Sequence, residues 1–367
     1  MLTWIEINAS AIRHNIRQFR RLIGPKTLLM PVIKSNAYGH GFLEIAKLCN
    51  ENKEVDRLCV VSLDEATTLI KNKITKPIII LSFYDPLDKN CVQAIKRGVV
   101  FPLYTLEQAG KLSAVGKKAG RKVKVHLKID TGTSRVGVLP NEAVRFVETV
   151  QKKFPNIYFE GVWSHFSSSE TDKKETKKQW KIFNQVIKKL ESRGVQFPIK
   201  HMACSAATIL HPETQGTAVR VGLGLYGLEP SEKIRTKLSL NPALSWFTTI
   251  IQVKQVPAGV KIGYSGTYTT NQPAKLAVIP VGYYDGYDRR FSNVAAVEIR
   301  GTRCPIRGRI CMNLAMVDVT KVKNVVAGDK VMLIGRGVTA DELAEIAHTI
   351  NYEIVSRINP LIPRIIA

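Results

Sequence analysis

The chain has 367 residues, of which 45% are hydrophobic and 23% are charged, and its formal net charge is +24. This length and balance are typical of a soluble globular protein with two domains, and no apolar run approaches the length of a bilayer-spanning helix. The positive charge raises the hypothesis of nucleic-acid binding, but no recognisable nucleic-acid-binding module accompanies it.

The sequence up to about residue 235 alternates strand and helix patterns. Apolar, β-branched segments predict strands at residues 27–33, 57–62, 77–82, 99–103, 122–129, 158–164, 199–203 and 218–221. Helical periodicity fills the gaps, with one apolar stripe at Ile12, Ile16, Phe19, Leu22 and Ile23 and another at Leu106, Ala109, Leu112 and Val115. Eight strands that are each followed by a helix predict a (β/α)8 barrel.

The densest basic run, residues 173–181, leads into an amphipathic helix whose apolar positions include Trp180, Phe183, Val186 and Ile187. Its lysines are therefore expected on a solvated helix face, and the remaining lysines are scattered along the chain. We expect no nucleic-acid partner and no membrane contact. The first residues show no basic or apolar leader, which predicts a cytoplasmic protein.

The pattern changes after about residue 240. Short strands are predicted at residues 246–256, 275–280, 294–299, 312–319 and 330–334. One helix is predicted to begin with the capping box Thr339-Ala340-Asp341-Glu342 and to run to Ile350. The predicted fold is an N-terminal (β/α)8 TIM barrel over residues 1–238, followed by a mostly β C-terminal domain over residues 239–367.

The six cysteines show no paired CxxC spacing, which predicts reduced and mostly buried thiols rather than disulfides or a metal site. They are Cys49, Cys59, Cys91, Cys204, Cys304 and Cys311.

The segment Gly222-Leu223-Gly224-Leu225-Tyr226-Gly227 fits the GxGxxG dinucleotide fingerprint. It follows the eighth predicted strand rather than the first, and no acidic residue occurs near residues 241–247, where a ribose ligand is expected. A phosphate-binding loop after the last barrel strand is the better interpretation.

Polar residues follow several of the predicted barrel strands. The set comprises Lys34, Arg135, His165, Cys204, Ser205, Arg220 and Gly222. Barrel active sites gather at the carboxyl ends of the strands, and this set suits an anionic, aromatic cofactor. Each residue alone also fits an ordinary role, as a snorkelling lysine, a core histidine or an ion-pair partner.

Seven segments together resemble the alanine racemases, a family of fold-type III enzymes that use pyridoxal 5'-phosphate. They are residues 31–41, 128–137, 163–166, 220–223, 263–268, 282–286 and 308–313. The resemblance covers nearly the whole chain. It implies a cytoplasmic isomerase that interconverts L-alanine and D-alanine for peptidoglycan precursors. It also implies a head-to-tail homodimer.

The resemblance also implies roles for individual residues. Lys34 is the Schiff-base lysine, and Tyr264, from the second domain, is the other acid/base. Arg135 contacts the substrate carboxylate, Lys128 is a site of carbamylation, and Arg220 meets the pyridine nitrogen beside His165. The remaining cofactor ligands are Tyr38, Ser205, Gly222, Leu223 and Tyr352, and Met312 and Tyr283 lie at the substrate.

Two positions depart from the family pattern. Cys204 stands where the family usually has asparagine, and Asn313 stands where it usually has aspartate. A broader racemase acting on serine or other small amino acids therefore stays open as an alternative. Two further alternatives are a decarboxylase with the same barrel and a non-enzymatic pyridoxal-phosphate carrier; the tyrosine segment and the 130-odd residues after the barrel argue against them.

Overall fold

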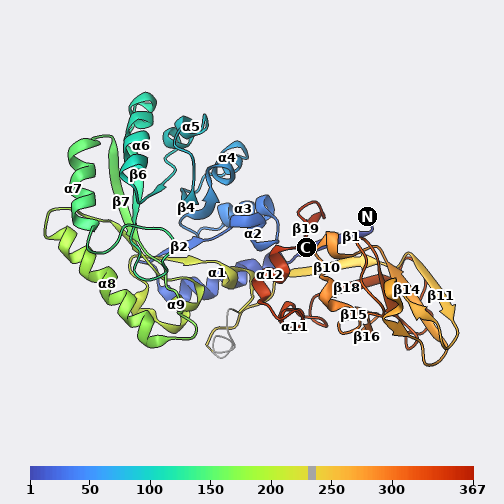
Figure 1. Cartoon of the computed structure of the whole chain (residues 1–367). Helices are drawn as coiled ribbons and strands as arrows, with labels where there is room; N and C mark the ends of the chain where they lie inside the picture. Colours follow the sequence, from blue (N-terminus) through green and yellow to red (C-terminus); the bar gives the residue numbers. More distant parts are fainter. Residues whose placement is uncertain (230–236) are drawn as a thin grey trace. The chain divides into compact units, whose positions relative to one another are not determined.

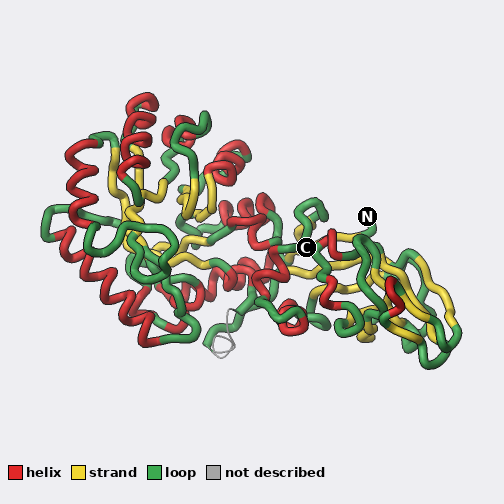
Figure 2. The backbone as a smooth tube through the Cα atoms, viewed as in Figure 1, coloured by secondary structure: helices red, strands yellow, loops and turns green. Residues whose placement is uncertain are grey.

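A computed structural model describes residues 1–229 and 237–367, which form two compact units (Figure 1). The barrel unit contains the described residues of 12–35 and 45–241. The C-terminal unit contains residues 1–11, 36–44 and 242–367. Figure 2 shows helices around the strands of the barrel unit and mostly strands and loops in the C-terminal unit.

Parallel strands form the centre of the barrel unit. They are β2 (Leu28–Pro31), β3 (Leu58–Ser62), β4 (Ile78–Phe83), β5 (Phe101–Leu103), β6 (Val123–Lys128), β7 (Ile157–Trp163), β8 (Ile199–His201) and β9 (Ala218–Val221). Six of them pair in the order β2-β9-β8-β7-β6-β5, and β3 pairs with β4. Parallel bridges from Val32 to Cys59 and from Ile79 to Val100 join this pair to both ends of the sheet. The ring is therefore closed, and the predicted (β/α)8 barrel is confirmed.

Helices follow the strands along the chain. They are α2 (Lys34–Tyr38), α3 (Phe42–Glu51), α4 (Leu63–Lys71), α5 (Cys91–Lys96), α6 (Leu106–Ala119), α7 (Ala143–Lys153), α8 (Lys173–Glu191) and α9 (Ser205–Leu210). Residues 230–236, within the stretch where the last barrel helix is expected, lie outside the described residues, and after β9 the described residues form a short 3-10 helix, η2 (Leu223–Tyr226). Helix α1 (Ala9–Ile23) lies against this segment, because the Asn15 amide donates to the carbonyls of Leu225 and Asn241 at 3.0 and 2.9 Å.

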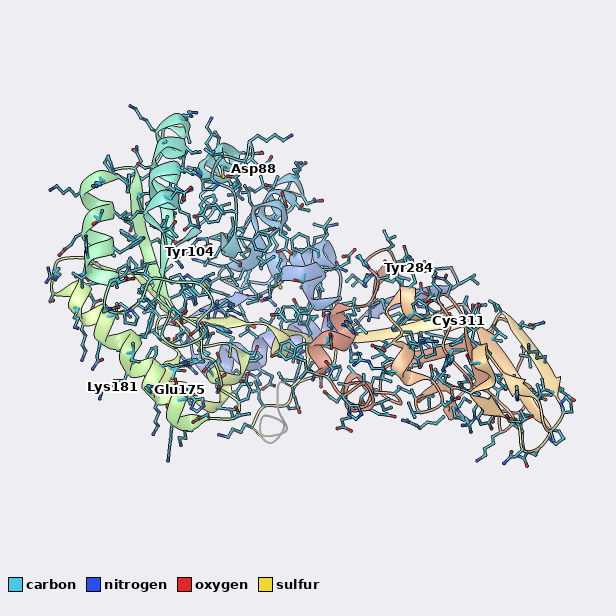
Figure 3. All side chains as sticks on the ribbon, in the orientation of Figure 1. Asp88, Tyr104, Glu175, Lys181, Tyr284 and Cys311 are labelled. Atoms are coloured by element: carbon cyan, nitrogen blue, oxygen red, sulfur yellow. The ribbon has the colours of Figure 1, made fainter. Side chains whose placement is uncertain are left out.

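The apolar stripes of α1 and α6 are buried except at one end of each. Leu22 and Leu106 are exposed, and the other stripe residues are buried. Helix α8 buries Phe183, Val186 and Ile187 and turns its lysines to solvent; Glu175 and Lys181 are labelled on it in Figure 3. The basic run is thus a solvated helix face, as predicted.

Three sheets form the C-terminal unit. The largest has the order β16-β15-β18-β10-β1-β19, the second β11-β14-β17 and the third β12-β13. Their bounds are β1 (Thr3–Ile7), β10 (Leu244–Thr249), β11 (Gln252–Val256), β12 (Lys261–Ile262), β13 (Tyr268–Thr269), β14 (Ala274–Ile279), β15 (Ala296–Ile299), β16 (Thr302–Pro305), β17 (Ala315–Asp318), β18 (Lys330–Ile334) and β19 (Arg364–Ile366). Trp246, Tyr287 and Phe291 form an edge-to-face aromatic cluster in the core of this unit.

Two predictions in this unit are wrong. The single strand predicted at residues 246–256 is two strands, β10 and β11, which belong to different sheets. Ile250 and Ile251 lie between the two strands and belong to neither. The change of sheet therefore falls inside one continuous apolar segment, which the sequence pattern does not distinguish from a single strand. The helix predicted to reach Ile350 is α11 (Ala340–Ile346), followed by α12 (Asn351–Ser356), with His348 between them at a φ of 51°.

The capping box is half formed. The Thr339 hydroxyl accepts from the Glu342 amide at 3.1 Å. The Glu342 carboxylate pairs with Arg303 instead of returning to Thr339. A tertiary ion pair has therefore replaced the second local hydrogen bond.

The chain passes between the units more than once. β1 pairs with β10 and β19, and residues 36–44 also belong to the C-terminal unit. These contacts join segments that are distant in sequence, and the predicted division at residue 238 remains a prediction. The separation of roles between a cofactor-binding domain and a tyrosine-supplying domain remains a prediction.

No helix in the described ranges is both long and apolar enough to cross a membrane. The six cysteines are free, with Cys204 and Cys311 partly exposed and the others buried. Burial raises the pKa of Cys49 and Cys59 to about 12, which keeps these thiols protonated and unreactive.

Candidate active site

Lys34 follows β2 and begins α2, whose hand is unusual. Ser35, Asn36, Ala37 and Tyr38 all have φ between 52° and 55°, so the turn is left-handed. Such a conformation costs L-residues roughly 1–2 kcal/mol each. The surrounding fold must therefore hold it in place.

Glu65 holds the start of this turn from the first turn of α4. Its carboxylate accepts from the Ser35 amide and from the Val61 amide, both at 2.7 Å. Within the C-terminal unit, the Asn36 side chain accepts from the Phe42 amide at 2.9 Å, and Arg364 donates to the Gly39 carbonyl at 3.1 Å. Gly39 is required there, because a Cβ would lie 1.9 Å from the Val355 carbonyl oxygen.

The Lys34 amine lies in a field of positive charge. Burial lowers its pKa, and Arg135 and Arg220 lower it further, whereas Glu65 opposes the shift. A lysine with a lowered pKa has more neutral amine near neutral pH, as a nucleophile or base requires.

Arg220, from β9, is the most highly coordinated side chain of the site. Its guanidinium donates to the carbonyls of Ser164 and Met202 at 2.9 and 3.1 Å. It also contacts the Nδ1 atoms of His201 at 2.6 Å and His165 at 3.1 Å. Burial and the Arg220 charge lower the pKa of both histidines well below the usual range, so both are neutral at pH 7.

Trp163, at the end of β7, contacts two basic side chains and a histidine. The Lys128 ammonium lies 3.9 Å from its ring centroid, the Arg220 guanidinium carbon lies at 4.8 Å, and the His201 ring stacks on it at 5.5 Å. Lys128 is buried, and its Nζ has no hydrogen-bond partner among the described residues. Burial, Arg220 and Arg135 lower the pKa of Lys128 well below its ordinary value.

Arg135 ends a tight loop after β6. The Asp130 carboxylate accepts from the amides of Gly132, Thr133, Ser134 and Arg135 at 2.9–3.2 Å. These bonds lower the pKa of Asp130 against the opposing effect of burial. The loop presents the Arg135 side chain to solvent, while its charge still acts on Lys34, Lys128 and His165.

A group of backbone amides converges after β9. The amides of Gly222 and Gly224 donate to the Ser205 hydroxyl at 2.9 and 3.3 Å, and Leu223 begins η2 beside them. Gly224 has no space for a side chain, because a Cβ would lie 2.6 Å from the Phe19 ring. Cys204, next to this loop, has its Sγ 3.3 Å from the Ser169 hydroxyl.

In the C-terminal unit, Tyr264 lies in a turn that depends on two glycines, Gly263 and Gly308. Gly263 and Ser265 have φ of 70° and 60°, and a Cβ at Gly263 would lie 2.8 Å from Met316. A Cβ at Gly308 would lie 2.6 Å from the Ile262 carbonyl oxygen. These close approaches fix the turn and leave the Tyr264 side chain 68% exposed.

Tyr264 and Tyr283 line one open cavity of about 570 Å³, together with Gly286, Asp288, Arg289, Ile310, Cys311 and Arg357. The amides of Tyr283 and Tyr284 donate to the carbonyls of Cys311 and Met312 at 3.1 and 3.0 Å. Figure 3 labels Tyr284 and Cys311 in this region. Met312 and Asn313 are exposed.

Tyr38 and Tyr352 also come together in the C-terminal unit, with ring centroids 6.1 Å apart. The predicted residues thus form two groups. Lys34, Lys128, Arg135, His165, Arg220 and the Ser205 loop belong to the barrel unit, and Tyr38, Tyr264, Tyr283, Met312 and Tyr352 belong to the C-terminal unit. Their catalytic and binding roles remain predictions. No cluster of three or more metal-ligating side chains occurs among the residues described.

The sequence interpretation missed His201, His126, Glu160 and Glu65. Each lies inside a predicted strand or helix. A polar residue at such a position is ordinarily taken to lie on the solvent-exposed face of an amphipathic element. The available signal was burial: parallel barrel strands are buried on both faces, so a histidine or glutamate inside one needs a partner.

Comparison with known proteins identifies the family of this chain. Residues 7–230 match the family model described as alanine racemase, N-terminal domain, and residues 243–366 match alanine racemase, C-terminal domain. The chain belongs to the alanine racemase family. An alanine racemase of Methanococcus maripaludis is 40% identical over 370 residues, covering 99% of this chain and 98% of that protein.

Solved structures of the family agree with the fold. An alanine racemase of Clostridium difficile has a TM-score of 0.95 and 36% identity, covering 100% of this chain and 96% of that one. The Bacillus anthracis alanine racemase, solved with bound L-Ala-P, has a TM-score of 0.92 and 34% identity, covering 100% and 95%.

The neutral histidines predict an acid-sensitive fold. The pKa values of His126, His165 and His201 lie below the unfolded value of about 6.5, so the unfolded chain binds more protons below that pH. Their contribution to stability is therefore full above pH 6.5 and is lost as the pH falls. Each histidine should remove about 1.4 kcal/mol of unfolding free energy per pH unit until its folded pKa is reached.

Urea unfolding between pH 7.5 and 5 measures this slope. The exposed His348 provides the control, and His348→Asn should leave the slope unchanged. A free energy of unfolding that stays constant or rises between pH 6.5 and 5 would contradict neutral histidines.

Proposed function

We propose that this chain interconverts L-alanine and D-alanine, with pyridoxal 5'-phosphate as its cofactor. The observation that carries the proposal is the lysine at the carboxyl end of the barrel. Lys34 combines a lowered pKa with two nearby guanidinium groups and a strained, tethered turn. The membership of the whole chain in the alanine racemase family supports the same activity.

The barrel unit fits an anionic aromatic cofactor. Burial, Arg135 and Arg220 lower the pKa of Lys34 and of Lys128, and Glu65 and Asp130 are the carboxylates that oppose these shifts. A phosphate would add negative charge to this surplus of positive charge, and the amides of Gly222 and Leu223 with the Ser205 hydroxyl are suited to receive it. We propose Tyr38 and Tyr352 as further phosphate ligands and Lys34 as the covalent attachment.

When bound, pyridoxal phosphate supplies an electron sink for the charge that develops at the substrate α-carbon. The chain supplies the proton transfers. Lys34 Nζ exchanges the α-proton on one face, and the Tyr264 hydroxyl exchanges it on the other. Arg220 holds its protons too firmly to give one to the ring nitrogen, which disfavours transfer to other carbons.

Lys128 and Arg135 act together on the substrate carboxylate in this proposal. The neutral Lys128 amine can attack carbon dioxide, forming an N–C bond and releasing a proton, and the resulting carbamate is an anion beside Arg135. That anion would hold the Arg135 guanidinium in position. Met312 and Tyr283 would line the substrate on the side of the tyrosine.

We propose that two copies of the chain assemble head to tail, each supplying Tyr264 to the Lys34 site of the other. The exposure of Tyr264, Tyr283, Tyr284 and Met312 supports this assembly. Clustered exposed aromatic residues are typical of surfaces that meet a partner.

The second candidate is a racemase of wider range, acting on serine or other small amino acids. The departures at Cys204 and Asn313 favour it, since Cys204 contacts Ser169 beside the amide loop and Asn313 brings no charge. In either case we propose a cytoplasmic role in supplying D-amino acids to peptidoglycan precursors.

The first test concerns the cofactor and the reaction. The purified protein should absorb near the visible edge, and borohydride should attach the cofactor permanently to Lys34. A chiral assay against a panel of L-amino acids should show inversion of alanine without net product. Labelling of another lysine, with full activity in Lys34→Ala, would exclude the assignment, and net loss of carboxylate would indicate a decarboxylase.

The second test concerns assembly. Mixing inactive Lys34→Ala and Tyr264→Phe chains should restore up to about a quarter of the wild-type sites, because half of randomly paired dimers carry one intact site. Mixing Lys34→Ala with Lys34→Met provides the control and should restore nothing. A fully active monomer would exclude sharing of the site.

The third test separates the two faces. Tyr264→Phe removes one hydroxyl, and loss of a positioned acid/base costs about a hundredfold to ten-thousandfold in rate. Racemisation should fall in both directions, whereas exchange of the D-alanine α-proton in heavy water should persist better than exchange from L-alanine. Tyr268→Phe, in the same segment, should keep full activity. Equal loss of exchange for both enantiomers would contradict the face assignment, and undiminished racemisation would exclude Tyr264 as a base.

A further inference from the structure

A chain of buried polar side chains runs from Arg220 through the barrel interior. Arg220 Nη1 lies 2.6 Å from His201 Nδ1, and His201 Nε2 lies 2.8 Å from His126 Nδ1. His126 Nε2 lies 3.4 Å from Glu160 Oε2. The Glu160 carboxylate also accepts from Arg57 at 2.6 Å and from Lys124 at 2.8 Å.

The guanidinium end of the chain fixes the direction of the hydrogen bonds that follow it. A guanidinium only donates, so His201 Nδ1 accepts and its proton lies on Nε2. His126 Nδ1 then accepts from His201, and the His126 proton also lies on Nε2, facing a carboxylate that only accepts. The 3.4 Å contact with Glu160 is an ion-pair contact and does not meet hydrogen-bond geometry, and His126 Nε2 has no hydrogen-bond partner among the described residues, so Glu160 acts on His126 as an adjacent charge.

The backbone makes room for this chain. The β6–β7 pairing shifts register between Val125 and His126, which leaves Glu160 as an extra residue between Phe159 and Gly161. Such bulges commonly redirect a side chain near an active site. Gly161 is equally specific, because a Cβ there would lie 2.8 Å from His126 Nε2.

We propose that His201, His126 and Glu160 are positioning residues for Arg220, forming a one-way hydrogen-bond chain that locks both histidines in the Nε2–H form. The chain aligns the Glu160 charge with the guanidinium without bringing a carboxylate into the site. Arg220 is thereby held in one orientation and stays the only charged donor at its end of the chain. The kinetic part of this proposal rests on the proposed function, in which Arg220 faces the cofactor ring.

The chain is sensitive to protonation. A second proton on either histidine would place two donors face to face. Burial opposes protonation of both histidines most strongly. Arg220, Lys128 and Arg57 add to it at His201, and Arg57 and Arg220 add to it at His126, where Glu160 favours protonation. The cations therefore protect the direction of the chain from acid.

The first experiment reads the tautomers directly in the wild-type holoenzyme. Long-range ¹H–¹⁵N correlation spectra of ¹⁵N-histidine protein, assigned with His126→Asn and His201→Asn, should show Nδ1 unprotonated and Nε2 protonated at both residues near pH 7. A proton on Nδ1 of either residue, or a doubly protonated ring, would overturn the proposal. The result does not depend on alanine turnover, so it stands apart from the proposed function.

The second experiment tests positioning. Glu160→Gln keeps the shape of the side chain but removes the charge. It should leave the tautomers of His126 and His201 unchanged, because the Arg220 guanidinium sets them, and it should lower kcat about tenfold with KM within about twofold. Glu148→Gln, which breaks an exposed ion pair with Arg193, is the matched control and should leave kcat and KM unchanged. A wild-type kcat in Glu160→Gln would overturn the role of Glu160.

A double-variant cycle completes the test. His126→Asn should reproduce the kcat loss of Glu160→Gln, and the double variant should lose little more, because both substitutions interrupt one chain. Additive losses would show that the two residues act separately and would overturn the proposal. His126→Asn on its own keeps the question answerable if Glu160→Gln does not fold.

Discussion

The buried guanidinium of Arg220 is the constraint on which the rest of the barrel site depends. It cannot lose its proton, so every neighbouring group must accept a hydrogen bond or carry no charge. Carbonyls of Ser164 and Met202 and the Nδ1 atoms of two histidines meet this requirement. Burial and this fixed charge together keep the histidines neutral, and burial with the charges of Arg135 and Arg220 lowers the pKa of Lys34 and Lys128.

A carboxylate bonded directly to Arg220 would also satisfy the hydrogen-bond donors of the guanidinium, but it would neutralise the positive charge of the site. Its charge would cancel the positive field that lowers the pKa of Lys34. Glu160 is instead two imidazoles away, and its own charge is met by Arg57 and Lys124. Burial without a nearby counter-ion is costly, and the neutral relay reduces that cost while leaving the field at Lys34 in place. Glu65 has a different task, because it binds the backbone of the lysine turn.

The sequence predicted most of the fold because hydrophobic period and strand length are local properties. All eight barrel strands were found in this way, and Lys34, Arg135, His165 and Arg220 could be placed at strand ends. The errors have tertiary causes. Ile250 and Ile251 continue an apolar run through a change of sheet, and β1 pairs with strands from the other end of the chain. The bulge at Glu160 depends on two strands together, so neither His126 nor Glu160 could be recognised from one strand alone.

The same residue types have opposite consequences at two depths in this protein. The lysines of α8 lie in water, where charges more than about 10 Å apart are largely screened at moderate salt. They contribute to the net charge of +24 without defining a site. Arg220 and Lys128 lie against Trp163 inside the barrel, where burial and the Arg220 charge lower the pKa of Lys128. The chemistry of this chain therefore follows from where two or three cations are buried, and its overall charge is a separate property of the surface.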